Sequence, residues 1–177
     1  MGIPYCTYID EVSMRVCIQS LSDTIDLRSY DHIFYVLQGG LFLYEQLTEL
    51  QQFPKDYDLH SIEYHRHPVN GDRLVDKALP SGLSGKVLII DDVWDTAKTA
   101  TLIVNDARRQ IGITSLTFAV VAYKDTVPGR VEVPDVTVKA AVQVENYWLG
   151  GCGMDLGVEG PLNQDFRRLP ALVVKCD

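Results

Sequence analysis

The 177-residue sequence contains no long apolar run, and no stretch approaches the roughly 20 apolar residues that a membrane-spanning helix needs. Residues 1–10 have neither a basic region nor an apolar core, so the sequence predicts no secretory signal. Internal repeats and low-complexity linkers are also lacking. These absences predict one soluble, cytoplasmic domain over residues 1–177, without membrane contact.

Positive charge is scarce as well. The chain has 16 Lys and Arg against 24 Asp and Glu, which gives a net charge of −8. Such a chain does not bind nucleic-acid phosphates non-specifically, so no nucleic-acid partner is expected. An anionic substrate would need local backbone dipoles, a few well-placed cations or a bound metal.

Cysteine is limited to four residues, Cys6, Cys17, Cys152 and Cys176. None belongs to a C-x-x-C pair, and their spacing does not match a metal site. We therefore expect free thiols in a reducing compartment.

Four short apolar runs, rich in β-branched and aromatic residues, predict buried strands at 33–37, 59–64, 87–90 and 116–122. Helical spacing of apolar residues predicts helices over 42–50 and 100–111. Strand and helix alternate, so we expect an α/β fold whose central, mostly parallel sheet is flanked by helices.

Two segments lack a regular spacing of apolar residues. Residues 65–85 are rich in Gly, Pro and polar residues and predict a long, mobile loop of the kind that often covers a binding site. The Gly-rich stretch 142–177 predicts irregular structure, a small C-terminal hood over one end of the sheet.

Three of the predicted strands run into unusual residues, at 38–40, 91–99 and 123–125. Ligands of an open parallel sheet bind beyond the carboxyl ends of its strands. Because parallel strands share that edge, we expect the three segments to converge on one site.

The segment 91–99 is the most informative of the three. Its acids, hydroxyls and lysine are Asp91, Asp92, Asp95, Thr96, Lys98 and Thr99. A turn of this kind at a helix N-terminus suits a phosphate monoester, while the carboxylates suit sugar hydroxyls, a metal or a transferred proton. A helix cap after a buried strand would explain fewer of these residues.

The sequence Val-Leu-Ile-Ile-Asp-Asp-Val-Trp-Asp-Thr-Ala-Lys-Thr at 87–99 resembles the motif with which type I phosphoribosyltransferases bind phosphoribosyl pyrophosphate (PRPP). The similarity extends in order over nearly the whole chain and is closest to the hypoxanthine-guanine (6-oxopurine) enzymes. It implies that Asp91 and Asp92 bind the ribose hydroxyls and that Asp95 is the catalytic acid or base near N7 of the purine. The residues implied to cradle the 5′-phosphate are Thr96, Ala97, Lys98 and Thr99.

The same resemblance assigns the other strand ends. Gln38, Gly39 and Gly40 match the pyrophosphate loop, whose glycines allow close backbone approach. Arg167 matches a C-terminal arginine near the pyrophosphate. Lys124 matches the lysine that contacts the exocyclic oxygen of the purine.

Three further positions complete the implied site. Trp148 matches the aromatic residue that stacks on the base, and Leu149 supplies backbone contacts. Asp155 matches an acid that binds Mg²⁺ through water, and Tyr64 matches the tyrosine of the mobile lid. Taken singly, Lys124 would more often be a solvated strand end and Trp148 a core aromatic residue.

Three residues depart from the family pattern. Ala97 replaces the glycine of Asp-Thr-Gly, and this replacement is costly if the position needs a positive φ. Glu63 stands where a serine usually precedes the lid tyrosine, and Gln38 replaces a residue that is often basic.

The implied reaction is an Mg²⁺-dependent transfer of the phosphoribosyl group from PRPP to a 6-oxopurine, in a homodimer or homotetramer. The departures favour an alternative, a non-catalytic PRPP or nucleotide sensor on the same fold. A phosphoacceptor receiver domain would need about 110–120 residues after the acidic pair, and only 85 follow Asp92 (177 − 92). A P-loop NTPase does not fit residues 82–86, which lead into a strand.

Overall fold

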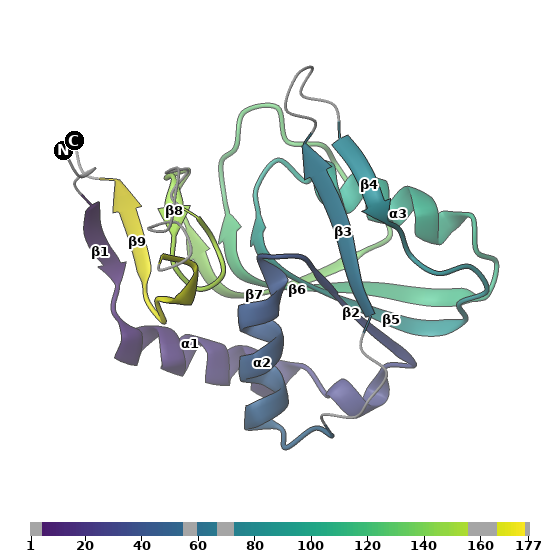
Figure 1. Cartoon of the computed structure of the whole chain (residues 1–177), viewed down its shortest axis with the longest axis horizontal. Coiled ribbons are helices and arrows are strands. Elements are labelled where there is room, and N and C mark those ends of the chain that lie inside the picture. The colour runs from purple at the N-terminus through teal and green to yellow at the C-terminus, as the bar shows by residue number, and fades with distance from the viewer. Residues whose placement is uncertain (1–4, 55–59, 67–72, 156–165, 176–177) are drawn as a thin grey trace.

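The computed structural model describes residues 5–54, 60–66, 73–155 and 166–175 (Figure 1). In chain order its elements are β1 (Tyr5–Ile9), α1 (Glu11–Thr24), the 3₁₀ turn η1 (Leu27–Ser29), β2 (His32–Val36), α2 (Gly40–Leu50), β3 (His60–Arg66), β4 (Arg73–Lys77), β5 (Gly85–Trp94), α3 (Lys98–Arg108), β6 (Ile113–Lys124), β7 (Thr137–Val144), β8 (Leu149–Gly150) and β9 (Leu172–Lys175).

The central sheet has six strands in the order β4-β3-β2-β5-β6-β7. Strands β2, β3, β5, β6 and β7 run parallel, and β4 is antiparallel to β3. Across the middle of the sheet Phe34 pairs with Ile89, Ile89 with Phe118, and Phe118 with Val138. The predicted mostly parallel sheet is therefore confirmed, and its strands end at one shared edge.

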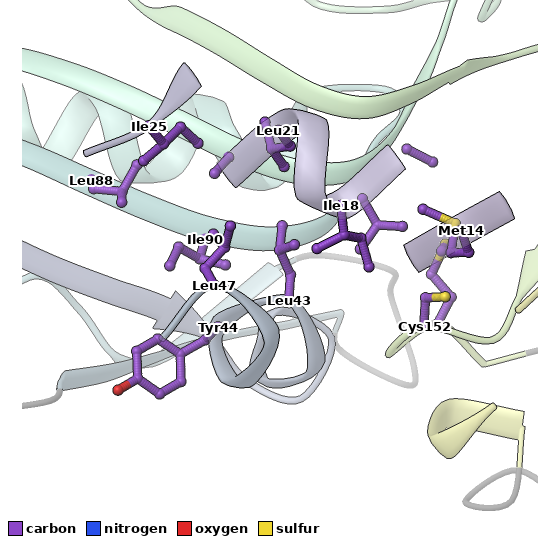
Figure 2. Packing of buried hydrophobic residues seen from close by; sticks show 14 of the residues in the cluster. Met14, Ile18, Leu21, Ile25, Leu43, Tyr44, Leu47, Leu88, Ile90 and Cys152 are labelled. Carbon is purple, nitrogen blue, oxygen red and sulfur yellow. The ribbon is translucent and has the colours of Figure 1, made fainter. Parts of the chain in front are cut away.

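Helices cover both faces of this sheet and bury two separate apolar layers. Figure 2 shows Ile18 of α1 and Leu43 and Leu47 of α2 directed into the layer that also holds Leu88 and Ile90 of β5. On the other face α3 buries the residues that the helical spacing predicted, Ala100, Ile103, Val104 and Ala107. Because β5 contributes side chains to both layers, it is fixed on two sides.

A second, three-stranded antiparallel sheet has the order β1-β9-β8. It joins the first described strand to the last, with Cys6 opposite Val174, and β9 in turn pairs with the short β8. This sheet is the hood, and it carries the segment that follows β7.

Three sequence predictions need correction. Residues 73–77 are the strand β4, so the expected loop over 65–85 is shorter than predicted. Residues 142–144 belong to β7, and the hood is a regular sheet that includes the N-terminal β1. Helix α3 ends at Arg108, so the predicted helix over 100–111 is too long, and Ile111 is exposed. Helix α1 and strands β1 and β7 were not predicted at all.

The expectation of four free thiols is wrong for Cys6, which is disulfide-bonded. Cys17 and Cys152 are free. Burial raises the pKa of the Cys152 thiol to about 12, so this cysteine is an apolar core residue and not a nucleophile at neutral pH. Of the helices described, none has the length and apolar character to cross a membrane.

Candidate active site

The acidic segment begins within strand β5 and not after it. β5 continues to Trp94, so Asp91 and Asp92 lie near the carboxyl end of this strand, in the part that pairs with β6. Asp91 Oδ1 accepts a hydrogen bond of 2.9 Å from the Asp92 amide, which holds the two acids together locally. Both side chains border the same cavity at the carboxyl edge of the sheet.

The turn from β5 into α3 has a left-handed residue at its centre. Ala97 caps α3 with φ 59° and ψ 16°, a conformation that glycine adopts at little cost and other residues rarely adopt. The departure from the Asp-Thr-Gly pattern therefore falls where it costs conformational energy. The Ala97 side chain is buried in the apolar layer under α3, which offsets part of that cost.

The carbonyl groups of this turn are bonded from outside the cavity. The Asp95 carbonyl accepts from Arg130 Nε at 3.0 Å, and the Thr96 carbonyl accepts from the Val131 amide at 3.0 Å. The Ala97 carbonyl accepts from the amide and the hydroxyl of Thr101, at 2.9 and 2.8 Å. With the carbonyls held on that side, the amides at the start of α3 can face an anion.

The glycine loop after β2 packs directly on this acidic strand. A Cβ at Gly39 would lie 2.2 Å from Asp92 Oδ2, and a Cβ at Gly40 would lie 2.2 Å from the Ile90 carbonyl oxygen. Gly153 of the hood, at φ +99°, approaches Gly39 in turn, since its Cβ would lie 2.1 Å from the Gly39 carbonyl oxygen. The peptide bond Leu37–Gln38 is cis. Only glycine fits at these three positions, so the loop, β5 and the hood form one close-packed wall.

Lys124 and Asp95 form an ion pair across the cavity floor. Lys124 Nζ donates to Asp95 Oδ2 at 3.1 Å. Lys124 ends β6 and is only 7% exposed, whereas the Asp95 carboxylate is partly open to solvent. A buried lysine with one partner and donor capacity to spare can contact a further acceptor, such as a carbonyl oxygen of a ligand.

The hood supplies the opposite side. Trp148 precedes β8 and is 59% exposed, while Leu149 is buried. Arg167 donates to the Gly153 carbonyl at 2.7 Å and forms an ion pair with Asp155. The predicted magnesium acid and the predicted pyrophosphate arginine are therefore partners of each other.

Asp92 has a perturbed acidity. Desolvation by burial raises the pKa of Asp92 above its ordinary value, while a hydrogen bond from the Val93 backbone and the charge of Arg167 oppose the rise. A partly buried carboxylate of this kind is stabilised by a nearby cation or by hydrogen-bond donors of a ligand.

Two adjoining cavities, of about 370 and 190 Å³, share Asp92, Val93, Asp95 and Trp148. The larger also borders the turn of residues 95–99, which is predicted to bind a phosphate and is called the phosphate turn below, together with Gln38, Gly39 and Arg167. The smaller borders Lys124, Leu149 and Asp155. The structure thus brings together the predicted site residues of β5, α3, β6, the glycine loop and the hood. Gly40 packs against the Ile90 carbonyl and does not line either cavity, and the predicted lid residue Tyr64 lies on β3.

A roomier groove of about 950 Å³ lies elsewhere, between β7 and the segment 130–136. Its lining is mostly aliphatic, and the acids at the end of β5 do not take part. We place the chemistry in the smaller cavities because polar and charged groups from four chain segments converge there.

The residues fit Mg²⁺ only as a substrate-bound ion. Within the described residues, no three His, Cys, Asp or Glu side chains converge into a cage for a metal. Of Asp91, Asp92 and Asp155, two border each cavity: Asp91 and Asp92 the larger, and Asp92 and Asp155 the smaller. Mg²⁺ characteristically takes one or two carboxylates, with water and substrate phosphates as its other ligands, and this donor set suits that mode.

Sequence reasoning missed Arg130 and Gly153. Arg130 lies in an irregular segment, and its partners at Asp95 and Asp125 are backbone carbonyls, which leave no signature in the sequence. Gly153 was part of a Gly-rich stretch, a signal that could have pointed to a close backbone approach.

The arrangement of sheet, phosphate turn and hood defines the type I phosphoribosyltransferase fold, and this chain has that fold. The chain resembles individual proteins in its structure and not in its sequence. No model of a protein family matches the sequence, and no curated protein matches it significantly.

Among solved structures, the chain is similar to hypoxanthine phosphoribosyltransferase from Trypanosoma cruzi in complex with the product IMP (TM-score 0.72, 19% identity, 96% of this chain and 93% of that one). It is also similar to a hypoxanthine-guanine phosphoribosyltransferase from Bacillus anthracis (0.69, 19%, 96% and 95%). A hypothetical protein from Neisseria gonorrhoeae with bound ppGpp matches as well (0.61, 18%, 81% and 84%). At these identities the likeness establishes the fold.

Proposed function

We propose that the protein transfers the 5-phosphoribosyl group of PRPP to N9 of a 6-oxopurine such as hypoxanthine, guanine or xanthine. The products are the nucleoside monophosphate and pyrophosphate, as in purine salvage. The observation that carries the proposal is the Asp95–Lys124 ion pair between the two adjoining cavities, next to a phosphate turn on one side and an exposed Trp148 on the other.

The smaller cavity suits the purine base. Trp148 offers an exposed ring for stacking, and Lys124 Nζ offers hydrogen-bond donors for the 6-oxo group. Asp95 lies next to Lys124, where its carboxylate can accept the proton that N7 loses as N9 forms its bond to C1′. General base catalysis of this kind typically contributes about 10²–10⁴-fold.

The larger cavity suits PRPP. The backbone at the start of α3 and the side chains of Thr96 and Thr99 would hold the 5′-phosphate, and Asp91 and Asp92 would hold the ribose hydroxyls. The backbone around Gln38 and Gly39, together with Arg167, would take up charge as the bond from C1′ to pyrophosphate breaks. Mg²⁺, held by the substrate with Asp155, Asp91 and Asp92 nearby, would supply charge neutralisation of the leaving group.

Turnover with PRPP and Mg²⁺ tests the proposal. Hypoxanthine, guanine, xanthine, adenine and orotate are supplied separately, and nucleotide formation is followed. We expect turnover with at least one 6-oxopurine, and we expect Asp95→Asn to reduce kcat by about 10²-fold or more while PRPP binding changes little. If no nucleotide forms with any of the five bases, the proposed transferase activity is contradicted. Equal losses in kcat and PRPP affinity in Asp95→Asn would contradict the role of Asp95.

A second candidate is a sensor that binds PRPP or a guanine nucleotide without catalysis. The strained Ala97 and the uncharged Gln38 in the phosphate-binding loops motivate it, together with the ppGpp bound to the Neisseria gonorrhoeae protein of similar fold. Binding of PRPP or ppGpp to the purified protein, with no product from any base, would favour this candidate.

We also propose that the ligands are PRPP and a purine base, that the chain forms a homodimer or homotetramer, and that no nucleic acid is a partner. Tyr64 is proposed to belong to a lid over the site. Light scattering of the purified protein would measure the assembly state.

A further inference from the structure

Arg130 bonds both chain segments that carry the Asp95–Lys124 ion pair, although it lines neither of the two cavities. Its Nε donates to the Asp95 carbonyl at 3.0 Å, and its Nη1 donates to the Tyr123 hydroxyl at 2.9 Å and to the Asp125 carbonyl at 3.3 Å. The guanidinium also lies over the Tyr123 ring, 4.7 Å from its centre. The third nitrogen, Nη2, is buried without a hydrogen-bond partner among the described residues.

These contacts fall on both chain segments that carry the central ion pair. Tyr123 and Asp125 are the chain neighbours of Lys124. Asp95, whose carbonyl Arg130 also bonds, is the residue with which Lys124 forms the ion pair. One planar side chain therefore holds the Tyr123 side chain and the Asp125 carbonyl, on either side of the lysine, and the carbonyl of the aspartate. Arginine suits this role because its donors diverge in a rigid plane that can also stack on an aromatic ring.

Val131, which follows Arg130, bonds the same turn. The Val131 amide donates to the Thr96 carbonyl at 3.0 Å, so residues 130 and 131 hold two successive carbonyls of the phosphate turn. The residue after those two carbonyls is the left-handed Ala97. A turn with such a residue at its centre needs support from outside if its amides are to keep one direction.

We propose that Arg130 is a positioning residue, which sets the distance between Asp95 and Lys124 and fixes the direction of the phosphate turn. The inference rests on the proposed transferase function and deepens it. Arg130 itself touches no reacting atom, so its effect on catalysis passes through Asp95. A displacement of about 1 Å at a catalytic group can cost about 10²-fold in rate, which sets the expected size of the effect.

The first test is the turnover of Arg130→Met, with Arg108→Met as its matched control. Arg108 also bonds the segment after β6, through the Pro134 carbonyl at 3.2 Å and Asp135 at 3.3 Å, but far from the ion pair. We expect Arg130→Met to lower kcat and kcat/KM for hypoxanthine together by about 10²-fold. Arg108→Met should leave both unchanged, and an equal loss in the two variants would overturn the proposal.

The second test separates positioning from stability with a double-mutant cycle. If Arg130 acts through Asp95, Arg130→Met in an Asp95→Asn background should lower kcat by no more than about threefold. Independent effects, whose reductions multiply, would overturn the proposal. Arg130→Lys keeps the charge and one donor and should have an intermediate rate. It replaces Arg130→Met in the cycle if the methionine variant does not fold.

A third measurement distinguishes failure of this inference from failure of the transferase function. If the wild type is inactive with every base, the affinity for GMP is measured directly. We then expect Arg130→Met to weaken GMP binding by about tenfold or more and Arg108→Met to leave it unchanged. Unchanged affinity in Arg130→Met, or no GMP binding by the wild type, would overturn the positioning role.

Discussion

Lys124 Nζ lies 3.1 Å from Asp95 Oδ2, so the two side chains that the site offers to a purine ring are bonded to each other. The pair couples a buried lysine to a partly exposed carboxylate at the carboxyl edge of the sheet. A base that enters between Trp148 and this pair therefore meets a donor and an acceptor side by side.

Lys124→Met should reduce selectivity for the 6-oxo group. A hydrogen bond from a charged donor is worth about 1.5–3 kcal/mol, so we expect kcat/KM for hypoxanthine to fall by roughly 10–150-fold. Adenine has no 6-oxo group, and its kcat/KM should not fall. Initial rates with both bases measure the ratio, and an equal loss for hypoxanthine and adenine would contradict the role of Lys124.

Trp148→Ala should weaken base binding without affecting stability. Stacking of a base on an aromatic ring is worth about 1–3 kcal/mol, which predicts a rise in KM for hypoxanthine of roughly 5–150-fold. Because Trp148 is 59% exposed, its loss should shift Tm by no more than about 2 °C. Tyr147→Ala is the matched control, since Tyr147 is 42% exposed and contacts Tyr8 and Glu145 instead. A rise in KM of equal size in the control would contradict stacking on Trp148.

The convergence of the strand ends could be predicted from the sequence because parallel strands share one carboxyl edge, and residues 38–40, 91–99 and 124 each follow a recognisable apolar run. The support of the site could not be predicted. Arg130 bonds backbone carbonyls, and any residue type supplies those equally. Strand β1 pairs with β9 across almost the whole chain, and short non-local strands leave little local pattern. The sequence did not determine whether Ala97 has a positive φ, and the structure shows that it does.

Asp92→Asn should stabilise the protein at neutral pH and impair PRPP binding. Desolvation raises the pKa of Asp92 in the folded protein above the unfolded value of 3.8. The folded state therefore holds this proton more tightly, so the stabilisation is fully present below pH 3.8 and is lost as the pH rises through the folded pKa. At pH 7 the wild type bears the cost of a partly desolvated charge that asparagine lacks.

Unfolding midpoints between pH 4 and pH 8 measure this effect. The midpoint of Asp92→Asn should exceed that of the wild type at pH 7, and the gap should narrow as the pH falls toward 3.8. Asp135→Asn, at a carboxylate that is 86% exposed, is the control and should follow the wild type closely. A gap that is constant with pH would contradict the assignment to Asp92, since only a titrating group makes it vary.

Ala97→Gly should leave stability nearly unchanged, because three effects of similar size oppose one another. Relief of the left-handed conformation gains about 1–2 kcal/mol. The greater freedom of glycine in the unfolded chain costs about 0.4–1 kcal/mol, and loss of a buried methyl group costs about 0.8 kcal/mol. We therefore expect Tm to change by no more than about 3 °C, since about 1 kcal/mol shifts Tm by about 2–4 °C at this size.

Ala100→Gly is the matched control for this substitution. Ala100 belongs to the same helix and the same apolar layer, but it has no strain to relieve because it lies within the first turns of α3. Glycine there costs about 1 kcal/mol in helix propensity and about 0.8 kcal/mol in burial, which predicts a fall in Tm of about 3–7 °C. Ala97→Val should destabilise by about 2 kcal/mol or more, since a β-branched residue is rarely found at positive φ.

The same variants decide whether Ala97 weakens phosphate binding. Ala97 lines the larger cavity, but it is only 6% exposed and packs in the layer under α3, so we expect its methyl group to leave room for a 5′-phosphate. We expect Ala97→Gly to change PRPP affinity by less than about threefold, because a group that makes no contact with the ligand contributes little to binding. A tenfold gain in affinity would show instead that the methyl group obstructs the phosphate turn, and it would make Ala97 a cause of weak PRPP binding in this chain.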